Sequence, residues 1–182
     1  TSQHGWKWGD MIYALGFRLA GLAKQDFVVH ATTVQDIHDA KAAGPLVHQY
    51  RRPLPLLAAG QVLAPEASAI MDVSDGLLID ASRLCRASGC AARIDLDNLP
   101  ISRAYVAERG ADRRARLAAA TGGDDYALLA ALAPDFDPLS LSLPSGTILA
   151  PIGTLDQGEG LTLFDAAGEV PLPEQLGYEH RA

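Results

Sequence analysis

The sequence contains few cysteines, few aromatic residues and no long apolar run. Its two cysteines, Cys85 and Cys90, match neither a C-x-x-C motif nor a metal-ligand spacing, which favours reduced thiols in a cytosolic protein. No apolar run approaches the roughly 20 residues that cross a bilayer, and no signal peptide is visible. We therefore expect a cytoplasmic protein with no membrane partner.

Runs of positive charge are also absent. Twenty-two acidic and 15 basic residues give a formal net charge of -7. Because nucleic acids are bound mainly through Lys and Arg, this balance argues against a nucleic-acid partner. It still allows phosphate binding through a metal ion or backbone amides. Neither a P-loop nor a G-x-S-x-G motif occurs, which argues against a standard NTPase or a serine hydrolase.

The apolar patterns predict alternating strands and helices. Residues 77–88 have the clearest helical spacing, and Gly89 is well placed to end that helix. Residues 68–73 are almost continuously apolar, which predicts a strand buried on both faces. Further strands are predicted at 11–15, 27–30, 92–96, 126–132, 147–152 and 161–164, and further helices at 33–43, 46–51, 56–63, 103–108 and 113–120. This alternation indicates a layered α/β domain with a mixed sheet.

Two aspartates, Asp72 and Asp75, lie where the strand gives way to the helix. A helix start favours phosphate, and carboxylates there would repel it unless a divalent cation lay between them. Asp72 and Asp75 therefore suit a Mg²⁺–phosphate site, with Ser74 as a donor to a phosphate oxygen. The alternative is structural: Asp75 caps the helix and Asp72 pairs with an arginine.

A second acidic turn, TGGDDY, includes Asp124. Its two glycines would permit positive φ and close approach of a ligand. Equally, they would end a helix before a polar loop. Arg51 and Arg52 suit an anion or a solvated helix end. Tyr178 suits stacking on a ligand ring or packing of the tail onto the domain.

Four segments, taken together in this order, resemble one known family. They are YRRPLPLLAAGQVLAP, MDVSDGLLIDASRLCRASGCAARIDLDNLPIS, TGGDDYALL and GYEH. The combination is similar to the carboxyl-terminal half of thiamine-monophosphate kinase, in the superfamily of aminoimidazole ribonucleotide synthetase and selenophosphate synthetase. The resemblance extends from about residue 47 to residue 180. It implies a three-layer α/β/α sandwich with a mixed sheet and partial ferredoxin-like topology, over residues 47–182, after a diverged arm at 1–46.

The resemblance also implies a chemistry. Members of the family transfer the γ-phosphate of ATP to thiamine phosphate, with several Mg²⁺ ions. By motif, Asp72 and Asp75 resemble metal ligands and Ser74 an ATP-contacting residue. Asp124 stands at the substrate-contacting glutamate of the family's G-G-E-D-Y motif, and Tyr178 where an aromatic residue packs on the substrate. The expected partners are therefore ATP and thiamine phosphate, and a homodimer is among the assemblies that the resemblance allows.

The sequence departs from the family before residue 47. Residues 9–13, GDMIY, match the family's G-D-x-I-Y strand, but the turn at 16–22 lacks an expected aspartate. The family's amino-terminal half, which carries an acidic metal cluster and much of the nucleotide site, has no counterpart. We therefore expect the isolated chain to be impaired or inactive. A non-catalytic nucleotide or thiamine phosphate-binding module, and another ATP-dependent synthetase, remain as alternatives.

Overall fold

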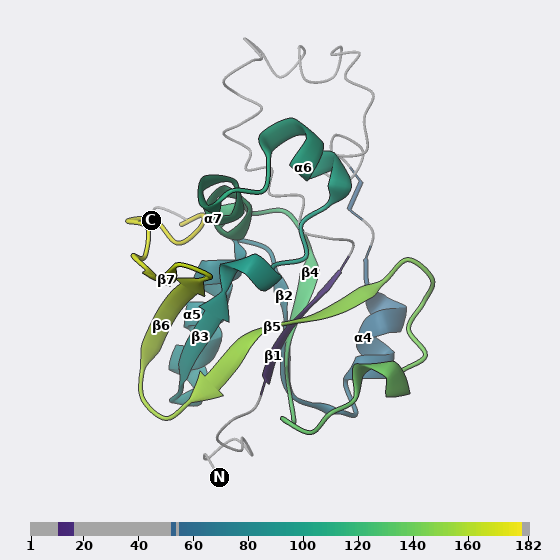
Figure 1. Cartoon of the computed structure of the whole chain (residues 1–182). Coiled ribbons are helices and arrows are strands. Elements are labelled where there is room, and N and C mark those ends of the chain that lie inside the picture. The colour runs from purple at the N-terminus through teal and green to yellow at the C-terminus, as the bar shows by residue number, and fades with distance from the viewer. Residues whose placement is uncertain (1–10, 17–51, 54, 180–182) are drawn as a thin grey trace.

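The computed structural model describes residues 11–16, 52–53 and 55–179 (Figure 1). The strand predicted at 27–30 and the helices predicted at 33–43 and 46–51 lie outside these residues, as does most of the expected arm at 1–46. The division at residue 47 therefore stays a prediction. No helix within the described ranges is long and apolar enough to span a bilayer.

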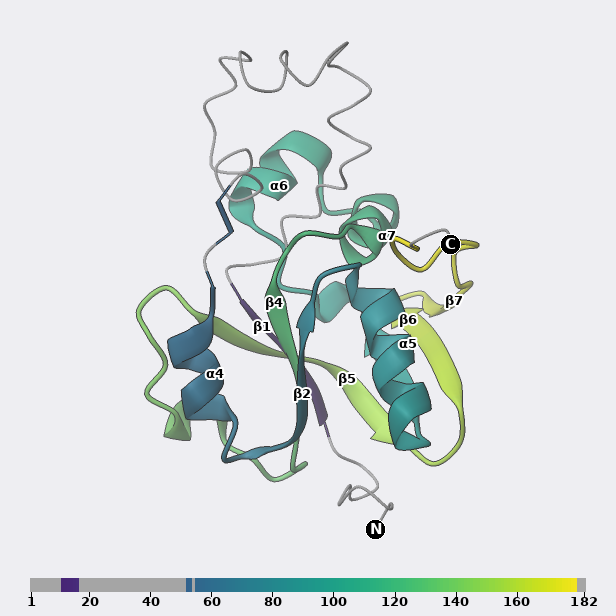
Figure 2. The same cartoon turned by 180° about the vertical axis from the view of Figure 1, so that it is seen from behind.

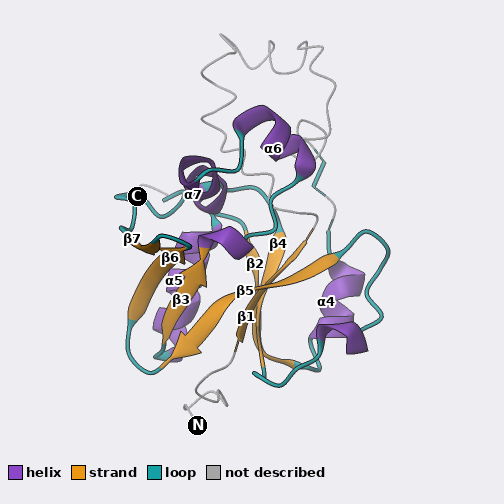
Figure 3. Cartoon of the chain, in the orientation of Figure 1, coloured by secondary structure: helices purple, strands orange, loops and turns teal. Residues whose placement is uncertain are grey.

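Seven strands form one mixed sheet in the order β2-β4-β1-β5-β3-β6-β7. All neighbours are antiparallel except β3 and β6, which are parallel. The bounds are β1 Met11–Gly16, β2 Ala67–Val73, β3 Ala91–Asp95, β4 Ala127–Leu132, β5 Ile148–Asp156, β6 Gly160–Asp165 and β7 Gly168–Val170. Figure 3 shows the strands in orange across the middle of the chain.

Helices lie on both faces of the sheet. The bounds are α4 Leu57–Leu63, α5 Leu77–Ser88, α6 Arg103–Arg109 and α7 Arg113–Thr121, with short 3-10 turns at Leu96–Asn98 and Pro138–Ser140. Figures 1 and 2, seen from opposite sides, show α5 lying across β3 and β6 and α4 beside the other end of the sheet.

Strand β4 shows why three layers form. Successive side chains of a strand point to opposite faces. Leu129 and Ala131 pack into the main core, which α5 and α7 cover. Ala130 and Leu132 join Ala59 of α4 in a second core on the other face. The predicted three-layer α/β/α architecture with a mixed sheet is therefore confirmed.

Helix α5 spans the predicted residues and is anchored by its apolar face. Leu77, Leu78 and Leu84 are buried, and burial of each such side chain contributes about 1.5–3 kcal/mol. Gly89 follows in the left-handed conformation, with φ 63°, and its N–H bonds to the carbonyl of Cys85. Because glycine adopts this conformation without a steric penalty, it ends the helix as predicted.

The prediction that β2 is buried on both faces is wrong. Ala69, Met71 and Val73 pack toward the main core, whereas Ile70 and Asp72 on the opposite face are exposed. Strand β2 lies at the edge of the sheet, and α4 covers that face only in part. The two-sided burial instead belongs to its neighbour β4.

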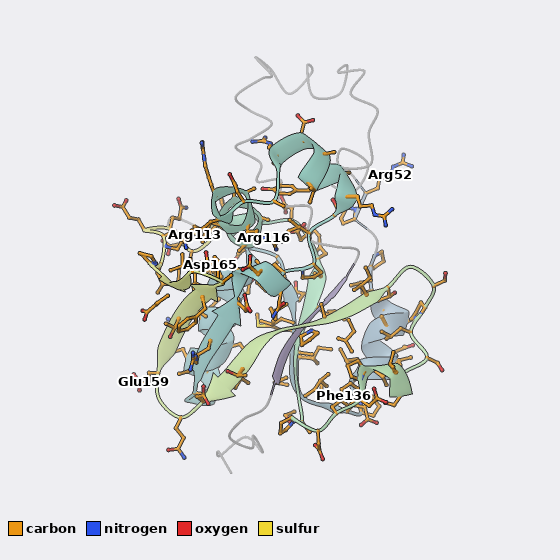
Figure 4. All side chains as sticks on the ribbon, viewed as in Figure 1. Arg52, Arg113, Arg116, Phe136, Glu159 and Asp165 are labelled. Carbon is orange, nitrogen blue, oxygen red and sulfur yellow. The ribbon has the colours of Figure 1, made fainter. Side chains whose placement is uncertain are left out.

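Charged side chains tie α7 to the other end of the sheet. Arg113 donates from Nε and Nη2 to the two carboxylate oxygens of Asp165 in β6, at 2.5 and 2.9 Å. Arg116 donates to the carbonyl oxygen of Leu96 at 2.9 Å and lies 3.6 Å from Asp97. Figure 4 shows Arg113, Arg116 and Asp165 grouped together. The network fixes one end of the helical layer.

Candidate functional site

The site begins at the turn between β2 and α5. Gly76 precedes the helix with φ 131° and ψ 145°, a backbone conformation that L residues rarely adopt. A Cβ at Gly76 would also lie only 3.0 Å from the carbonyl oxygen of Thr121. No side chain caps α5 at this position. The alternative prediction, that Asp75 caps the helix, is therefore wrong.

The carboxylate of Asp80 instead binds backbone N–H groups of the turn. Its Oδ2 accepts hydrogen bonds from the backbone N–H groups of Ser74 and Asp75, at 3.0 and 3.1 Å. Only 1% of Asp80 is exposed. A buried carboxylate is costly unless it is hydrogen-bonded and paired, and Arg83 supplies the charge partner through a 2.8 Å bond to Oδ1. Asp80 therefore fixes the backbone from which Ser74 and Asp75 project.

Asp75 also pairs with an arginine. Nη1 of Arg83 donates to its Oδ2 at 2.5 Å, the same nitrogen that contacts Asp80. The hydrogen bond to Asp75 is the main reason why the pKa of Arg83 is raised above its usual value. The sequence suggested an arginine partner for Asp72, and the structure shows such a partner, Arg83, at Asp75.

Two distant segments converge on this turn through backbone hydrogen bonds. The N–H of Asp124 donates to the carbonyl oxygen of Ser74, and that of Tyr178 to the carbonyl oxygen of Asp75, each at 2.7 Å. Gly123 is needed for this approach, because a Cβ there would lie 2.9 Å from the oxygen of Ser74. The structure therefore brings Ser74, Asp75, Asp124 and Tyr178 together, although they come from three separate segments.

Of the two interpretations made from the TGGDDY glycines, the structure confirms the helix stop, and close approach of a ligand stays a prediction. Gly122 ends α7, with its N–H bonded to the carbonyl of Ala118, whereas Gly123 makes the close approach to Ser74. Positive φ, expected at the glycines, falls instead on Asp124 at 65° and Tyr126 at 52°. Such conformations cost non-glycine residues of order 1–2 kcal/mol and persist only where the surroundings hold them.

Asp72 is one of the residues that line an apolar groove. It is exposed on the face of β2 opposite Val73. The groove between β2 and α4 has a volume of about 720 Å³, and Ile70, Leu57 and Tyr126 are among its lining residues. The hydroxyl of Tyr126 lies 3.5 Å from Oδ1 of Asp124. The groove therefore reaches from α4 to the acidic turn.

The donor set fits Mg²⁺ only in part. Within the portion of the chain that the structure describes, no group of three or more His, Cys, Asp or Glu side chains could hold a metal ion. Protein Mg²⁺ sites commonly use one or two carboxylates and complete the shell with water and phosphate oxygens. Asp72 and Asp75 offer carboxylates of that kind at the two ends of the turn, although Arg83 contacts Asp75 here.

An arginine pair and two cysteines also stand out in the sequence. Arg52 is exposed (Figure 4), and Arg51 lies outside the described residues, so anion binding by the pair stays a prediction. Cys85 and Cys90 are buried free thiols in the α5 region and face the core. Asp80, in contrast, was missed by the sequence analysis. Its signal was a charged residue on the apolar stripe between Leu77 and Leu84.

Comparison with known proteins shows the family to which the domain with this site belongs. Residues 9–165 match the family model of the AIR synthase related protein, C-terminal domain. The chain belongs to this family. The match of this AIR synthase related domain includes the β2–α5 turn and the TGGDDY turn.

The domain is similar to several thiamine-monophosphate kinases. It is 34% identical to that of Salmonella typhimurium strain LT2, over 98% of this chain and 54% of the relative. The crystal structure of thiamine-monophosphate kinase from Stenotrophomonas maltophilia K279a superposes with a TM-score of 0.65 at 30% identity, covering 86% of this chain and 50% of that one. The structure of AaThiL complexed with AMPPCP and TMP gives 0.67 at 25% identity, covering 96% and 53%.

The chain spans about half the length of the curated relatives that it matches. The similarity therefore extends over nearly the whole of this AIR synthase related domain but only part of each kinase. The likeness establishes the family and the fold.

Proposed function

We propose that the chain is the carboxyl-terminal part of a Mg²⁺-dependent thiamine-phosphate kinase, which converts ATP and thiamine phosphate into ADP and thiamine diphosphate. One observation carries the proposal. The residues that the kinase resemblance singles out on three separate segments meet at the Ser74–Asp75 turn. The AaThiL structure, similar over most of this chain, contains AMPPCP and TMP, which supports a nucleotide and a thiamine phosphate as ligands.

The residues of the turn have distinct roles in this proposal. Asp72 and Asp75 hold Mg²⁺, and Ser74 donates its hydroxyl to a phosphate oxygen of ATP. Bound Mg²⁺ would neutralise phosphate charge, the main requirement of phosphoryl transfer. The amides of Ser74 and Asp75 already bond to Asp80, so they fix the turn rather than bind phosphate. The amino-terminal end of α5 adds a partial positive charge nearby.

The thiamine side of the site is assigned to the other two segments. Asp124 is held by the strained turn and by its N–H bond to Ser74. We propose that its carboxylate contacts thiamine phosphate in place of the family's glutamate. Tyr178 is 47% exposed, so its ring is accessible for packing on the substrate. We also propose a cytoplasmic location, which two reduced cysteines favour.

The first test is formation of thiamine diphosphate, followed by chromatography, from the chain with thiamine phosphate, ATP and Mg²⁺. The amino-terminal half of a thiamine-monophosphate kinase is added in trans in a second series. We expect Asp75→Asn to abolish Mg²⁺-dependent nucleotide binding and any turnover without unfolding the chain. Asp156→Asn, an exposed aspartate at the end of β5, is the matched control. Nucleotide binding that survives Asp75→Asn would contradict the metal role.

A binding module without turnover is the second candidate. The contact between Arg83 and Asp75 favours it, because one of the two carboxylates assigned to Mg²⁺ is already neutralised by a guanidinium. Nucleotide binding without thiamine diphosphate formation, in both series, would favour this module. Turnover restored by the added half would favour the kinase part.

A further inference from the structure

Arg83 lies between two carboxylates that differ in their surroundings. Its Nη1 donates to Oδ2 of Asp75 at 2.5 Å and to Oδ1 of Asp80 at 2.8 Å. The exposed fractions of the three side chains are 37% for Arg83, 19% for Asp75 and 2% for Asp80. The guanidinium is therefore the outermost group of the three.

The contact with Asp80 belongs to the fold. Oδ2 of Asp80 is committed to the N–H groups of Ser74 and Asp75, and Oδ1 to Arg83. Arg83 lies three residues after Asp80 on α5, a spacing that places both side chains on the same face. Loss of this contact would leave a buried carboxylate without its cation, which is costly.

The contact with Asp75 is different in kind. Asp75 is more exposed than Asp80 and is the residue to which the proposed function assigns a metal. A divalent cation on this carboxylate would repel the guanidinium, which stays charged at every accessible pH. Because Arg83 cannot lose its proton, the repulsion is relieved only if the guanidinium moves. The guanidinium can move away from Asp75 while it keeps its hydrogen bond to Asp80.

We propose that Arg83 is the resident counter-cation of Asp75: it neutralises this carboxylate while no divalent cation is bound and releases it, while keeping Asp80, when a divalent cation binds. The inference rests on the proposed metal role of Asp75. Arg83 then lowers the affinity of the site for a lone cation, because each binding event must break the Arg83–Asp75 contact.

Binding of Mn²⁺ alone to the chain tests this competition, measured by the electron paramagnetic resonance signal of free Mn²⁺. We expect Arg83→Gln to bind Mn²⁺ roughly 1.5- to fivefold more tightly than the wild type, the range expected when a partly exposed ion pair no longer competes. Arg86→Gln is the matched control, because it removes the same charge from an exposed position on the same helix. Equal or weaker Mn²⁺ binding by Arg83→Gln, relative to both references, would overturn the proposal.

The variant Asp75→Asn distinguishes a failure of the metal role of Asp75 from a failure of the counter-cation role of Arg83. If Mn²⁺ binding by the wild type is absent or is unchanged in Asp75→Asn, the metal role itself fails. If Asp75→Asn loses Mn²⁺ but Arg83→Gln gains no affinity, only the counter-cation role fails. Tighter binding in Arg83→Gln, lost again in the Asp75→Asn/Arg83→Gln double variant, supports both.

A second measurement covers the case in which Arg83→Gln does not fold. The Nε–H signal of Arg83 in the wild-type chain is identified by nuclear magnetic resonance from its absence in Arg83→Lys, which retains the charge. We expect this signal to shift on addition of Mg²⁺, while that of Arg86 stays in place. An Arg83 signal that does not respond at saturating Mg²⁺ would contradict release of Asp75.

Discussion

The two cysteines show how burial sets the chemistry of a side chain. Cys85 and Cys90 are 1% and 2% exposed. Burial is the main cause that raises the pKa of the Cys85 thiol to about 12, and it raises the pKa of Cys90 as well. Both groups are therefore neutral thiols at physiological pH, whereas the thiolate is the reactive form.

We predict that neither thiol reacts with a disulfide reagent at pH 8 in the native chain and that both react in denaturant. The folded chain disfavours the thiolate of Cys85. The contribution of this thiol to the free energy of unfolding is therefore fully present below the unfolded pKa, near 8.5, and is lost as the pH rises toward about 12. Colorimetric thiol labelling measures the first effect. Rapid labelling of one thiol in the native chain would show that the end of α5 opens.

The aspartates show what a local pattern leaves out. The sequence indicated Asp75 as a metal ligand or a helix cap. In the structure, Asp80 is the aspartate that accepts hydrogen bonds from the backbone N–H groups of the turn. A charged residue on an apolar helical stripe signals a buried partner, but the stripe alone does not say which. The partner amides come from a turn whose geometry depends on Gly76 and on the distant Thr121. No spacing rule within α5 contains that information.

At the scale of elements, the carboxyl-terminal tail is held without helix or strand. Tyr178 bonds through its N–H to Asp75, and Gly177 lies against Ile79. A Cβ on Gly177 would collide with the side chain of Ile79 and the carbonyl oxygen of Asp75. The tail therefore docks only with a residue that has no side chain at this position.

We predict that Gly177→Ala weakens tail docking by about 1–3 kcal/mol, the usual cost of overpacking. Hydrogen exchange at the amide of Tyr178 should accelerate, while exchange in β4 should hardly change. Gln175→Ala, an exposed change in the same tail, is the control. Retained protection of Tyr178 in Gly177→Ala would mean that the tail is held by other contacts.

The positions of most helices and strands were predicted well from local signals, whereas the order of the strands and the exposure of their faces were not. The bounds of α5 followed from its spacing and from Gly89. The exposure of Ile70 did not, because it depends on β2 being an edge strand that α4 covers only in part. Strand β7 was missed because Gly168, which indicates a turn, also begins this three-residue strand against β6.

At the scale of the whole molecule, the ion pair of Arg113 and Asp165 links α7 to β6. The hydrogen bond from Arg113 is the main cause that holds the pKa of Asp165 below its usual value. A lowered carboxyl pKa contributes stability that is present above the unfolded pKa, near 3.9, and is lost as the pH falls through the folded value. The pair should therefore stabilise the fold at neutral pH and lose that contribution as the pH falls into the acidic range.

We predict that the urea midpoint of the wild type falls more steeply between about pH 5 and pH 2 than that of Asp165→Asn. The two chains should converge at the acidic end, where the carboxylate is protonated in both states. Asp156→Asn again serves as the control for loss of one exposed charge. Parallel pH profiles of Asp165→Asn and the wild type would show that the pair adds no stability.

The layered class could be predicted from the sequence, but the strand order could not. Alternating apolar segments indicate layers and a mixed sheet, which the structure confirms. The central place of β1, between β4 and β5, depends on pairings between residues far apart in the chain. Resemblance, rather than periodicity, supplied the residues of the candidate site, and their side-chain roles stay proposals.

The Ser74–Asp75 turn takes its partners from segments roughly 50 and 100 residues farther along the chain. Closing such long loops costs entropy before any contact forms. During synthesis, the turn therefore has to wait for residue 178 to leave the ribosome before its last backbone oxygen finds a donor. A nascent chain that already has its main sheet would still lack a finished site until the segment with residue 178 has emerged.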